Sequence, residues 1–125
     1  MVQAWEWATE NNFPEGFEKE YPSIEPKTRI SILSAGTPGM YPIVGPIVKN
    51  SDGCFVRVKE EELVDYGKII KREKGIYLGP ASVVCFAGFY EALKQNKIKN
   101  GDLVMLNTGE GCGRAQWFKE EIDKE

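Results

Sequence analysis

Residues 80–96 have apolar side chains on nearly every face of the helix that their spacing predicts. One face carries Val83, Phe86, Ala87, Tyr90 and Leu93, and the rest of the surface carries Val84, Cys85, Gly88 and Phe89. A helix that is apolar all round is buried between layers of structure and does not lie on a surface. Pro80 suits the first position of this helix, where an amide hydrogen would have no partner. The fold must therefore cover residues 80–96 on more than one side.

The segments around this helix predict an α/β arrangement. Residues 54–58 alternate like a strand, and residues 60–74 carry acids at their start and bases at their end, as the dipole of a helix favours. Residues 102–107 form a hydrophobic run typical of a parallel strand that is covered on both faces. Residues 114–122 can form a closing helix. The order strand, helix, helix, strand, loop, helix predicts the α/β class.

The first part of the chain gives weaker signals. Residues 2–8 are apolar and aromatic, but they are too few to distinguish a buried strand from an amphipathic turn. Residues 11–28 hold three prolines and many charges, which predicts a connecting loop with one helical turn in it. Residues 29–33 favour a short strand because they contain two β-branched isoleucines and a leucine. Residues 43–49 contain Pro46 in their middle, which predicts a distorted helix or a buried turn.

The composition limits the classes of function. A chain of 125 residues suffices for one ordinary domain, and 42% apolar with 28% charged residues is typical of a globular protein. The net charge of −3 argues against non-specific binding of nucleic acid, because that requires a basic face to neutralise phosphates. The absence of histidine removes the commonest general base, the imidazole-dependent triads and nearly all zinc sites other than all-cysteine ones.

The three cysteines, Cys54, Cys85 and Cys112, do not form a CxxC pair, which excludes a zinc ribbon and a disulfide framework. Their odd number fits a reducing cytoplasm. No run approaches the roughly 20 apolar residues of a membrane span, and the first residues lack the basic region of a signal peptide. We therefore expect a cytoplasmic protein with no metal site and no membrane segment.

Residues 108–113, Thr-Gly-Glu-Gly-Cys-Gly, directly follow the predicted strand 102–107. Ligands of open α/β sheets bind beyond the carboxyl ends of the strands. The three glycines would let a ligand approach the backbone closely, and Thr108 offers a hydroxyl. The pattern matches neither the GxGxxG fingerprint nor a Walker loop. On the residues alone, a plain connection from strand to helix is the favoured interpretation.

Two further side chains of this loop can carry chemistry. Cys112 lies ahead of a predicted helix, whose N-terminus would lower the pKa of the thiol. The favoured interpretation of Cys112 is a small residue in a tight loop, because the chain has no histidine to act as its base. Glu110 is the only acid of the loop. A substrate contact or base, and a solvated surface acid, are equal alternatives for it.

Residues 75–82, Gly-Ile-Tyr-Leu-Gly-Pro-Ala-Ser, are followed by the apolar helix, and residues 101–111 read Gly-Asp-Leu-Val-Met-Leu-Asn-Thr-Gly-Glu-Gly. With these segments, residues 75–113 resemble the C-terminal part of fold-type II pyridoxal-phosphate enzymes. The order and spacing of these segments are similar to those of threonine synthases. Residues 52–62 and the glycine- and proline-containing loop 34–42 also resemble segments of this family. The Leu-Asn-Thr-Gly run and that loop are nearer to cysteate synthases.

The resemblance covers residues 29–113 of a single domain over residues 1–125, with 1–28 as a loosely matched lead-in and 114–125 as a closing helix. It implies a three-layer αβα fragment with a short, mostly parallel sheet, as in the C-terminal part of the large domain of these enzymes. It also implies a fragment or subunit of a lyase or synthase that performs β- or γ-replacement on an amino acid such as O-phosphoserine. A fragment of a serine/threonine dehydratase-like enzyme and a non-catalytic interaction module that retains the fold are the alternatives.

The resemblance also implies a cofactor site for pyridoxal 5'-phosphate. It places Thr108 beside the pyridine nitrogen of the cofactor, with Gly109 and Ser82 nearby. A neutral hydroxyl does not enforce protonation of that nitrogen, which suits replacement and elimination chemistry. The Schiff-base lysine and the phosphate-binding loop lie upstream in this family, and no residue here matches them, so no catalytic residue is assigned. We expect the chain to require the missing N-terminal portion or a catalytic subunit.

Cutting such a fold would leave unpaired sheet edges, and unpaired edges drive association. We therefore expect a homo-oligomer.

Two residues depart from the family pattern. Gly79 stands where the family carries Glu before Pro-Ala-Ser, and Lys59 stands where the family has a Ser or Asp cap. Lysine is a poor residue for the start of a helix.

Overall fold

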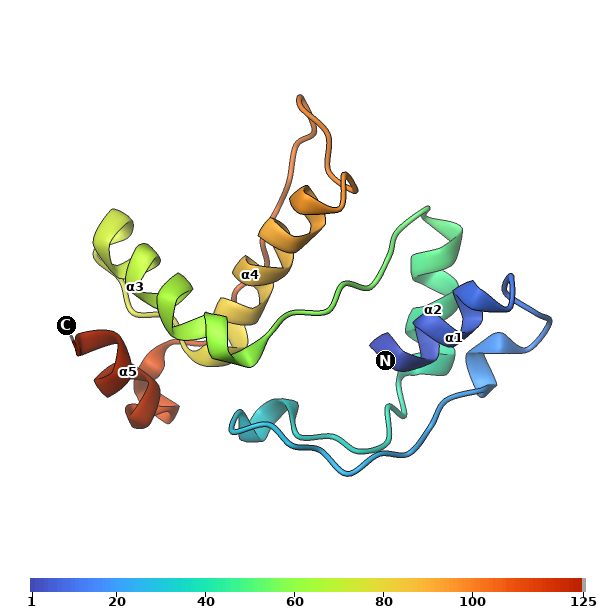
Figure 1. Cartoon of the computed structure of the whole chain (residues 1–125), viewed down its shortest axis with the longest axis horizontal. Coiled ribbons are helices and arrows are strands. Elements are labelled where there is room, and N and C mark those ends of the chain that lie inside the picture. Colours follow the sequence, from blue (N-terminus) through green and yellow to red (C-terminus); the bar gives the residue numbers. More distant parts are fainter. Residues whose placement is uncertain (125) are drawn as a thin grey trace. The chain divides into compact units, whose positions relative to one another are not determined.

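The computed structural model describes residues 1–124, and their regular structure is helical (Figure 1). The α-helices within these residues are α1 (Val2–Glu10), α2 (Tyr41–Asn50), α3 (Leu63–Lys74), α4 (Pro80–Lys94) and α5 (Gln116–Asp123). Single 3-10 turns are formed by Phe17–Lys19, Ser31–Leu33, Glu60–Glu62 and Cys112–Arg114. The chain divides into two compact units, Met1–Val56 and the residues from Arg57 onward. No helix in residues 1–124 is long and apolar enough to cross a membrane.

An aromatic cluster forms the core of the first unit. The ring of Trp5 in α1 lies 4.9 Å from that of Phe13 and 5.2 Å from that of Phe55. Tyr41, at the start of α2, is fully buried and contacts the ring of Phe55 at 6.2 Å. Burial raises the pKa of Tyr41, and the nearby charge of Glu18 adds to this effect. The packing of α1 against the start of α2 thus rests on aromatic rings.

The structure settles the ambiguous predictions for this unit. Residues 2–8 belong to helix α1, so the strand alternative for them is wrong. The short strand predicted at residues 29–33 is also wrong, because Ser31–Leu33 form a 3-10 turn. Residues 43–49 belong to helix α2, which continues through Pro46, so the helix alternative for them is confirmed and the buried-turn alternative is wrong.

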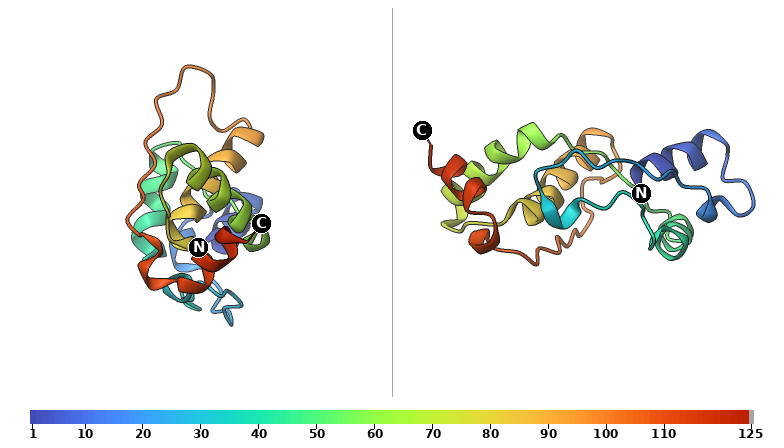
Figure 2. Two further views of the ribbon diagram at one scale, coloured as in Figure 1. Left: turned by 90° about the vertical axis from the view of Figure 1, so that its left-hand side faces the viewer. Right: turned by 90° about the horizontal axis from the view of Figure 1, so that it is seen from below.

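The helices of the second unit lie where the sequence predicts them. The predicted helix 60–74 begins with the 3-10 turn Glu60–Glu62 and continues as α3, which ends at Gly75 with a φ of 69°. Helix α4 begins at Pro80, and α5 falls within the predicted closing segment. In this unit α3 packs against both α4 and α5 (Figures 1 and 2). The buried side chains of these three helices include Leu63, Ile70, Val83, Ala87, Phe118 and Ile122.

A close approach of α3 and α5 depends on Gly67. A Cβ atom on this residue would lie 2.7 Å from Cδ1 of Ile122 and 3.3 Å from the ring of Phe118. Real Cβ atoms essentially never lie within 3.0 Å of another heavy atom. The missing side chain at position 67 therefore leaves the space that the two apolar side chains of α5 fill.

Helix α4 is covered on one side only. Val83 and Ala87 are buried against the unit, whereas Cys85 and Tyr90 on other faces are exposed. The expectation that residues 80–96 are buried between layers is therefore wrong for the described structure. Residues 1–124 do not supply the second layer that an all-apolar helix requires.

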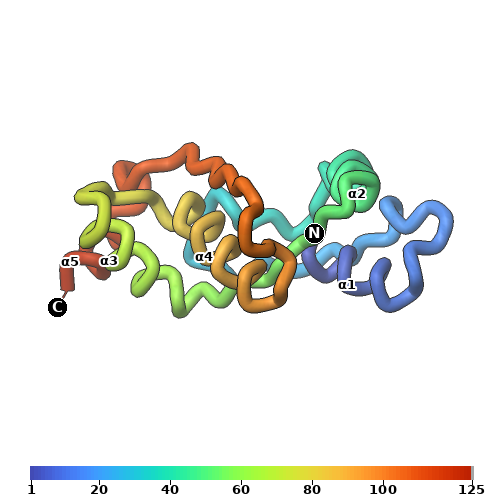
Figure 3. Tube along the Cα trace, turned by 90° about the horizontal axis from the view of Figure 1, so that it is seen from above, coloured from blue at the N-terminus to red at the C-terminus, as the bar shows by residue number. Residues whose placement is uncertain are grey.

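The predicted strands do not form a sheet within residues 1–124. Residues 54–58 have no regular structure, and residues 102–107 run back along α4 as an extended, unpaired segment (Figure 3). The prediction that 102–107 is a buried strand is wrong here, because Leu103 is 102% exposed and Met105 is 89% exposed. A strand is stable only when neighbouring strands accept and donate its backbone hydrogen bonds. The α/β class and the three-layer arrangement are neither confirmed nor excluded by these helices.

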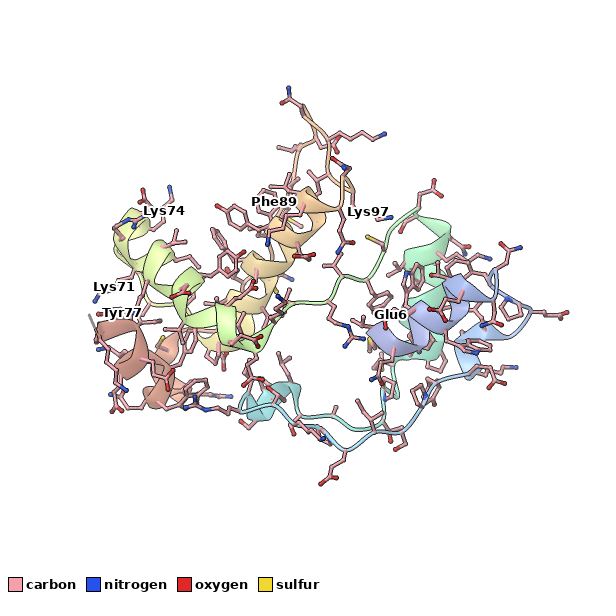
Figure 4. All side chains as sticks on the ribbon, viewed as in Figure 1. Glu6, Lys71, Lys74, Tyr77, Phe89 and Lys97 are labelled. Atoms are coloured by element: carbon pink, nitrogen blue, oxygen red, sulfur yellow. The ribbon has the colours of Figure 1, made fainter. Side chains whose placement is uncertain are left out.

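Asp123 at the end of α5 binds three side chains, and the bond from Lys71 fastens this helix to α3. Its carboxylate accepts hydrogen bonds from Lys71 at 2.6 Å, Tyr77 at 2.5 Å and Lys119 at 3.0 Å. The ammonium groups of Lys71 and Lys119 also lie 5.0 and 4.6 Å from the centre of the Tyr77 ring, and Figure 4 shows Lys71 beside Tyr77. Two cations and a hydroxyl thus surround one carboxylate.

These hydrogen bonds predict an acid-sensitive contact between α3 and α5. The bond from Lys71, followed by those from Tyr77 and Lys119, holds the pKa of Asp123 well below its ordinary value of 3.8. The bond to Asp123 raises the pKa of Lys71 to about 12. A carboxyl whose pKa is lowered by folding stabilises the fold above its unfolded pKa, and this contribution is lost as the pH falls below that value.

We expect hydrogen exchange of the α5 amides to accelerate as the pH drops below 3.8, relative to the exchange expected for an unstructured chain. Asp123→Asn should remove this pH dependence, because the amide carries no charge to lose. Glu120→Gln is the control, since Glu120 lies on the same helix and accepts a hydrogen bond from Gln116 of that helix. An equally steep acid response in the Asp123→Asn variant would contradict the assignment.

Candidate functional site

Residues 108–113 return to the start of α4 and are joined to it by hydrogen bonds. The amide of Gly79 donates to the carbonyl of Glu110 at 3.0 Å. The amide of Glu110 donates to Oγ of Ser82 at 2.8 Å. An antiparallel β-bridge links Leu78 to Gly111. We call residues 78–82 together with 110–112 the loop junction.

The side chain of Glu110 takes part in the loop junction as well. Its Oε2 accepts a hydrogen bond from the amide of Ala81 at 3.3 Å, and the residue is half-buried. Neither the substrate-contact nor the solvated-acid interpretation anticipated this bond to the backbone of α4. The sequence signal that could have found it is Gly79, the glycine that departs from the family pattern. A Cβ at Gly79 would lie 2.6 Å from Oε2 of Glu110.

Cys112 is a buried member of the loop junction. Its thiol donates to the carbonyl of Leu78 at 2.8 Å, and only 6% of the residue is exposed. Burial raises the pKa of the Cys112 thiol. A lowered pKa is therefore wrong, and the interpretation of Cys112 as a small residue in a tight loop is confirmed. A thiol that stays protonated at neutral pH is a poor nucleophile.

The predicted cofactor-binding residues separate into two kinds. Ser82 is 3% exposed, and its hydroxyl faces the backbone of Glu110 instead of solvent. Thr108 and Gly109 are exposed, and the Thr108 hydroxyl makes no hydrogen bond within residues 1–124. A Cβ at Gly109 would have no atom within 4 Å. Thr108 and Gly109 therefore form an accessible edge, which we call the Thr108 edge, and Ser82 supports the loop from behind.

The Thr108 edge fits a flat heteroaromatic ring chemically. A hydroxyl both donates and accepts, so it can meet a ring nitrogen in either protonation state. Gly109 leaves the neighbouring backbone uncovered, which lets a ring face approach it. Ser82 does not fit a direct contact, because its oxygen is buried and already accepts the Glu110 amide. These residues can hold one edge of a cofactor, and that assignment stays a prediction.

A separate cleft of about 410 Å³ lies between the residues that lead into α3 and the second half of α4. Its charged lining is paired, because Lys59 lies 3.5 Å from Glu62 and Lys94 lies 3.5 Å from Glu91. None of the predicted site residues lines this cleft. The cleft and the Thr108 edge are thus different features of the unit.

Comparisons with known proteins identify relatives that match most of the chain. A threonine synthase of Methanocaldococcus jannaschii is 30% identical over 91 residues, which are 72% of this chain and 22% of that protein. A cysteate synthase of Methanospirillum hungatei is 28% identical over 120 residues, which are 93% of this chain and 28% of that protein. A threonine synthase of Halalkalibacterium halodurans is 26% identical over 100 residues, which are 79% of this chain and 28% of that protein.

No protein-family model and no solved structure matches the chain. The chain spans about a quarter of the length of the curated relatives it matches. These relatives carry the two family names that the motifs of residues 29–113 indicated. The chain is therefore related in sequence to threonine synthase and cysteate synthase, enzymes of the fold-type II pyridoxal-phosphate group.

Proposed function

We propose that this chain supplies one edge of the cofactor site in a pyridoxal-phosphate-dependent synthase that acts on an amino-acid substrate. The observation that carries this proposal is the Thr108 edge, an exposed hydroxyl without a partner in residues 1–124 beside an open glycine. Pyridoxal 5'-phosphate supplies an electron sink for bonds at the α-carbon of an amino acid. Thr108 would hold the ring nitrogen, Gly109 would leave room for the ring, and Ser82 would support the loop.

Gly109 supports the proposed place of the cofactor ring, because nothing in residues 1–124 requires a glycine at this position. The backbone of Gly109 is not in the left-handed region, and no neighbour in residues 1–124 excludes a side chain there. The described fold therefore gives no need for glycine at position 109. A ring that lies against the backbone would provide that need.

The proposal includes a second portion of the enzyme that completes the site. The chain spans about a quarter of the length of its relatives. The resemblance implies that the Schiff-base lysine and the phosphate-binding loop of the family lie upstream of the segments that it covers. Leu103 and Met105 are exposed on an unpaired extended segment that leads directly to Thr108. We infer that this second portion, as a preceding segment or a separate subunit, pairs with residues 102–107 and covers both side chains. The chain would then be one α/β fragment over residues 1–125.

The parent reaction that we propose is β- or γ-replacement on a substrate such as O-phosphoserine or O-phosphohomoserine. A serine/threonine dehydratase-like reaction and a non-catalytic module are the other outcomes that the following experiment distinguishes. Cytoplasmic localisation is part of the same proposal.

A complementation experiment tests this function. The segment that matches this chain is deleted from the cysteate synthase of Methanospirillum hungatei, and this chain is supplied as a separate polypeptide. We expect the mixture to retain pyridoxal 5'-phosphate absorbance after dialysis, whereas this chain alone does not. Synthase activity, dehydratase activity or cofactor retention without activity would then distinguish the three alternatives. Stoichiometric retention by this chain alone, mapped to one lysine, would contradict the need for a second portion.

Thr108→Val should weaken cofactor binding in the complemented enzyme by about fivefold, which corresponds to about 1 kcal/mol for one net hydrogen bond. Valine keeps the shape of threonine and removes the hydroxyl. Thr108→Ser keeps the hydroxyl and should bind the cofactor like the parent chain. Asn107→Ala controls for a change elsewhere in the exposed segment. Equal affinities for the Thr108→Val variant and the parent, measured by fluorescence titration with the cofactor, would contradict the contact.

A further inference from the structure

A side chain at Gly79 is excluded by neighbouring atoms and not by the backbone conformation of this residue. Its φ of −71° and ψ of 160° are open to any residue. A Cβ there would lie 2.6 Å from Oε2 of Glu110 and 2.7 Å from the carbonyl oxygen of Gly111. Two atoms of the returning loop thus occupy the place where a side chain at residue 79 would begin.

Glu110 performs at the start of α4 the task that a capping side chain usually performs. Gly79 precedes the helix and has no side chain to accept a backbone hydrogen bond. Pro80 has no amide hydrogen, so Ala81 is the first residue of α4 that needs an acceptor. Oε2 of Glu110 accepts that bond at 3.3 Å. The negative carboxylate is also favoured at the positive end of the helix dipole.

The backbone of Glu110 is fixed at the same place. Its carbonyl accepts from the amide of Gly79 at 3.0 Å, and its amide donates to the buried Oγ of Ser82 at 2.8 Å. The side chain and the backbone of one residue therefore make three bonds to residues 79–82. Thr108 lies two residues earlier and makes no side-chain bond of its own in residues 1–124. Glu110 is therefore the nearest residue after Thr108 in the loop that is bonded to the start of α4.

We propose that Glu110 is the positioning residue of the Thr108 edge and that Gly79 is its required counterpart. The carboxylate of Glu110 enters the space beside Gly79, holds the loop against α4 and thereby presents Thr108 and Gly109 outward. The resembling family carries an acid at position 79, whereas this chain brings an acid to the same point from the loop. The inference rests on the proposed function only for the identity of the ring that Thr108 meets.

The test uses the complete chain and three readouts that need no cofactor. The first is the alkylation rate of Cys112, which is buried in the loop junction, with exposed Cys54 and Cys85 as internal references. The second is hydrogen exchange of the Ala81 amide. The third is the position of the Thr108 and Gly109 amide resonances. The variants are Glu110→Ala, Glu110→Gln and Gly79→Ala, with Glu61→Ala as the control because Glu61 is an exposed acid on α3's leading turn.

Glu110→Ala should accelerate both Cys112 alkylation and Ala81 exchange by about tenfold and should shift the resonances of Thr108 and Gly109. Glu110→Gln should stay within about twofold of the parent chain, because its amide oxygen still accepts from Ala81. Gly79→Ala should shift the Thr108 resonance although Glu110 is present, because the added methyl group displaces the loop. Glu61→Ala should change none of these readouts.

Two results would overturn the proposal. The first is a Glu110→Ala variant whose Thr108 resonance and Cys112 rate equal those of the parent chain. The second is a Glu110→Gln variant as disturbed as Glu110→Ala. If Glu110→Ala does not fold, Glu110→Gln and Gly79→Ala still decide the question, because one must preserve the Thr108 resonance and the other must move it. The Glu110 and Gly79 variants could behave as expected while Thr108→Val leaves the cofactor affinity unchanged. That combination would refute the proposed function and leave the positioning role of Glu110 standing.

Discussion

Gly67→Val is expected to separate α5 from α3 and to lower the free energy of unfolding of the second unit by about 2–3 kcal/mol, the upper part of the range for overpacked cores. The first added carbon would lie 2.7 Å from Cδ1 of Ile122 and 3.3 Å from the ring of Phe118. Phe118 is fully buried and Ile122 is 4% exposed, so neither can turn outward without losing its burial. The two further methyl groups of valine increase the overlap.

Gly67→Ala separates the two effects that a side chain at this position has. Alanine stabilises the interior of a helix by about 1 kcal/mol relative to glycine. The single methyl group meets the flexible end of Ile122, which can yield by a small rotation at some cost in packing. We expect these effects nearly to cancel, which leaves the alanine variant close to the parent chain.

Urea denaturation followed by helical circular dichroism measures both Gly67 variants, and hydrogen exchange of the α5 amides locates the change. Gly67→Val should expose the α5 amides more than those of α4. A valine variant as stable as the parent chain would show that α5 is not packed against Gly67.

The helices of the second unit could be predicted from the sequence because the information for them is local. The acids and bases of residues 60–74 indicated α3 and its direction, and Pro80 indicated the first residue of α4. The contact of α3 with α5 could not be predicted. It depends on the space beside Gly67, and no periodicity shows which residue of another helix fills that space.

The predicted strands are wrong for residues 1–124 because a strand depends on partners that are distant in the sequence. Residues 102–107 have the composition of a buried strand, but a strand requires partners, and residues 1–124 supply none. Residues 2–8 were ambiguous because seven residues contain too few turns to separate the two periods. Local patterns therefore indicated which segments are apolar without indicating what covers them.

In the candidate site, too, the sequence indicated the segments and the structure shows the contacts between them. The resemblance assigned Thr108, Gly109 and Ser82 to the cofactor, and the structure shows which two of them are accessible. Gly79 is a sequence signal that something fills the place of its side chain, but Glu110, which fills it, lies 31 positions away and is identified only by the structure. The departure from the family pattern at Gly79 is thus explained by the side chain of Glu110.

The exposed segment of residues 102–107 predicts how the isolated chain behaves in solution. Leu103 and Met105 are 102% and 89% exposed, and the backbone around them is not paired within residues 1–124. Alternate residues of an extended segment point to the same side, so these two side chains form one apolar row. Unpaired backbone and exposed apolar rows both favour contact with another chain. Without the portion that we propose covers this row, copies of the chain should associate through it.

Leu103→Glu combined with Met105→Glu should abolish that association. Burial of a large apolar side chain contributes about 1.5–3 kcal/mol, so the loss of two such side chains should weaken self-association by at least about a hundredfold. Light scattering over a wide range of concentrations should show dimers or larger species for the parent chain and monomers for the double variant. Asn107→Glu is the control, because it adds a charge to the same extended segment without removing an apolar side chain. It should weaken association only through charge, so added salt should restore the association of this control but not that of the double variant, which lacks the apolar row. A parent chain that remains monomeric at every concentration would contradict the predicted association through this row.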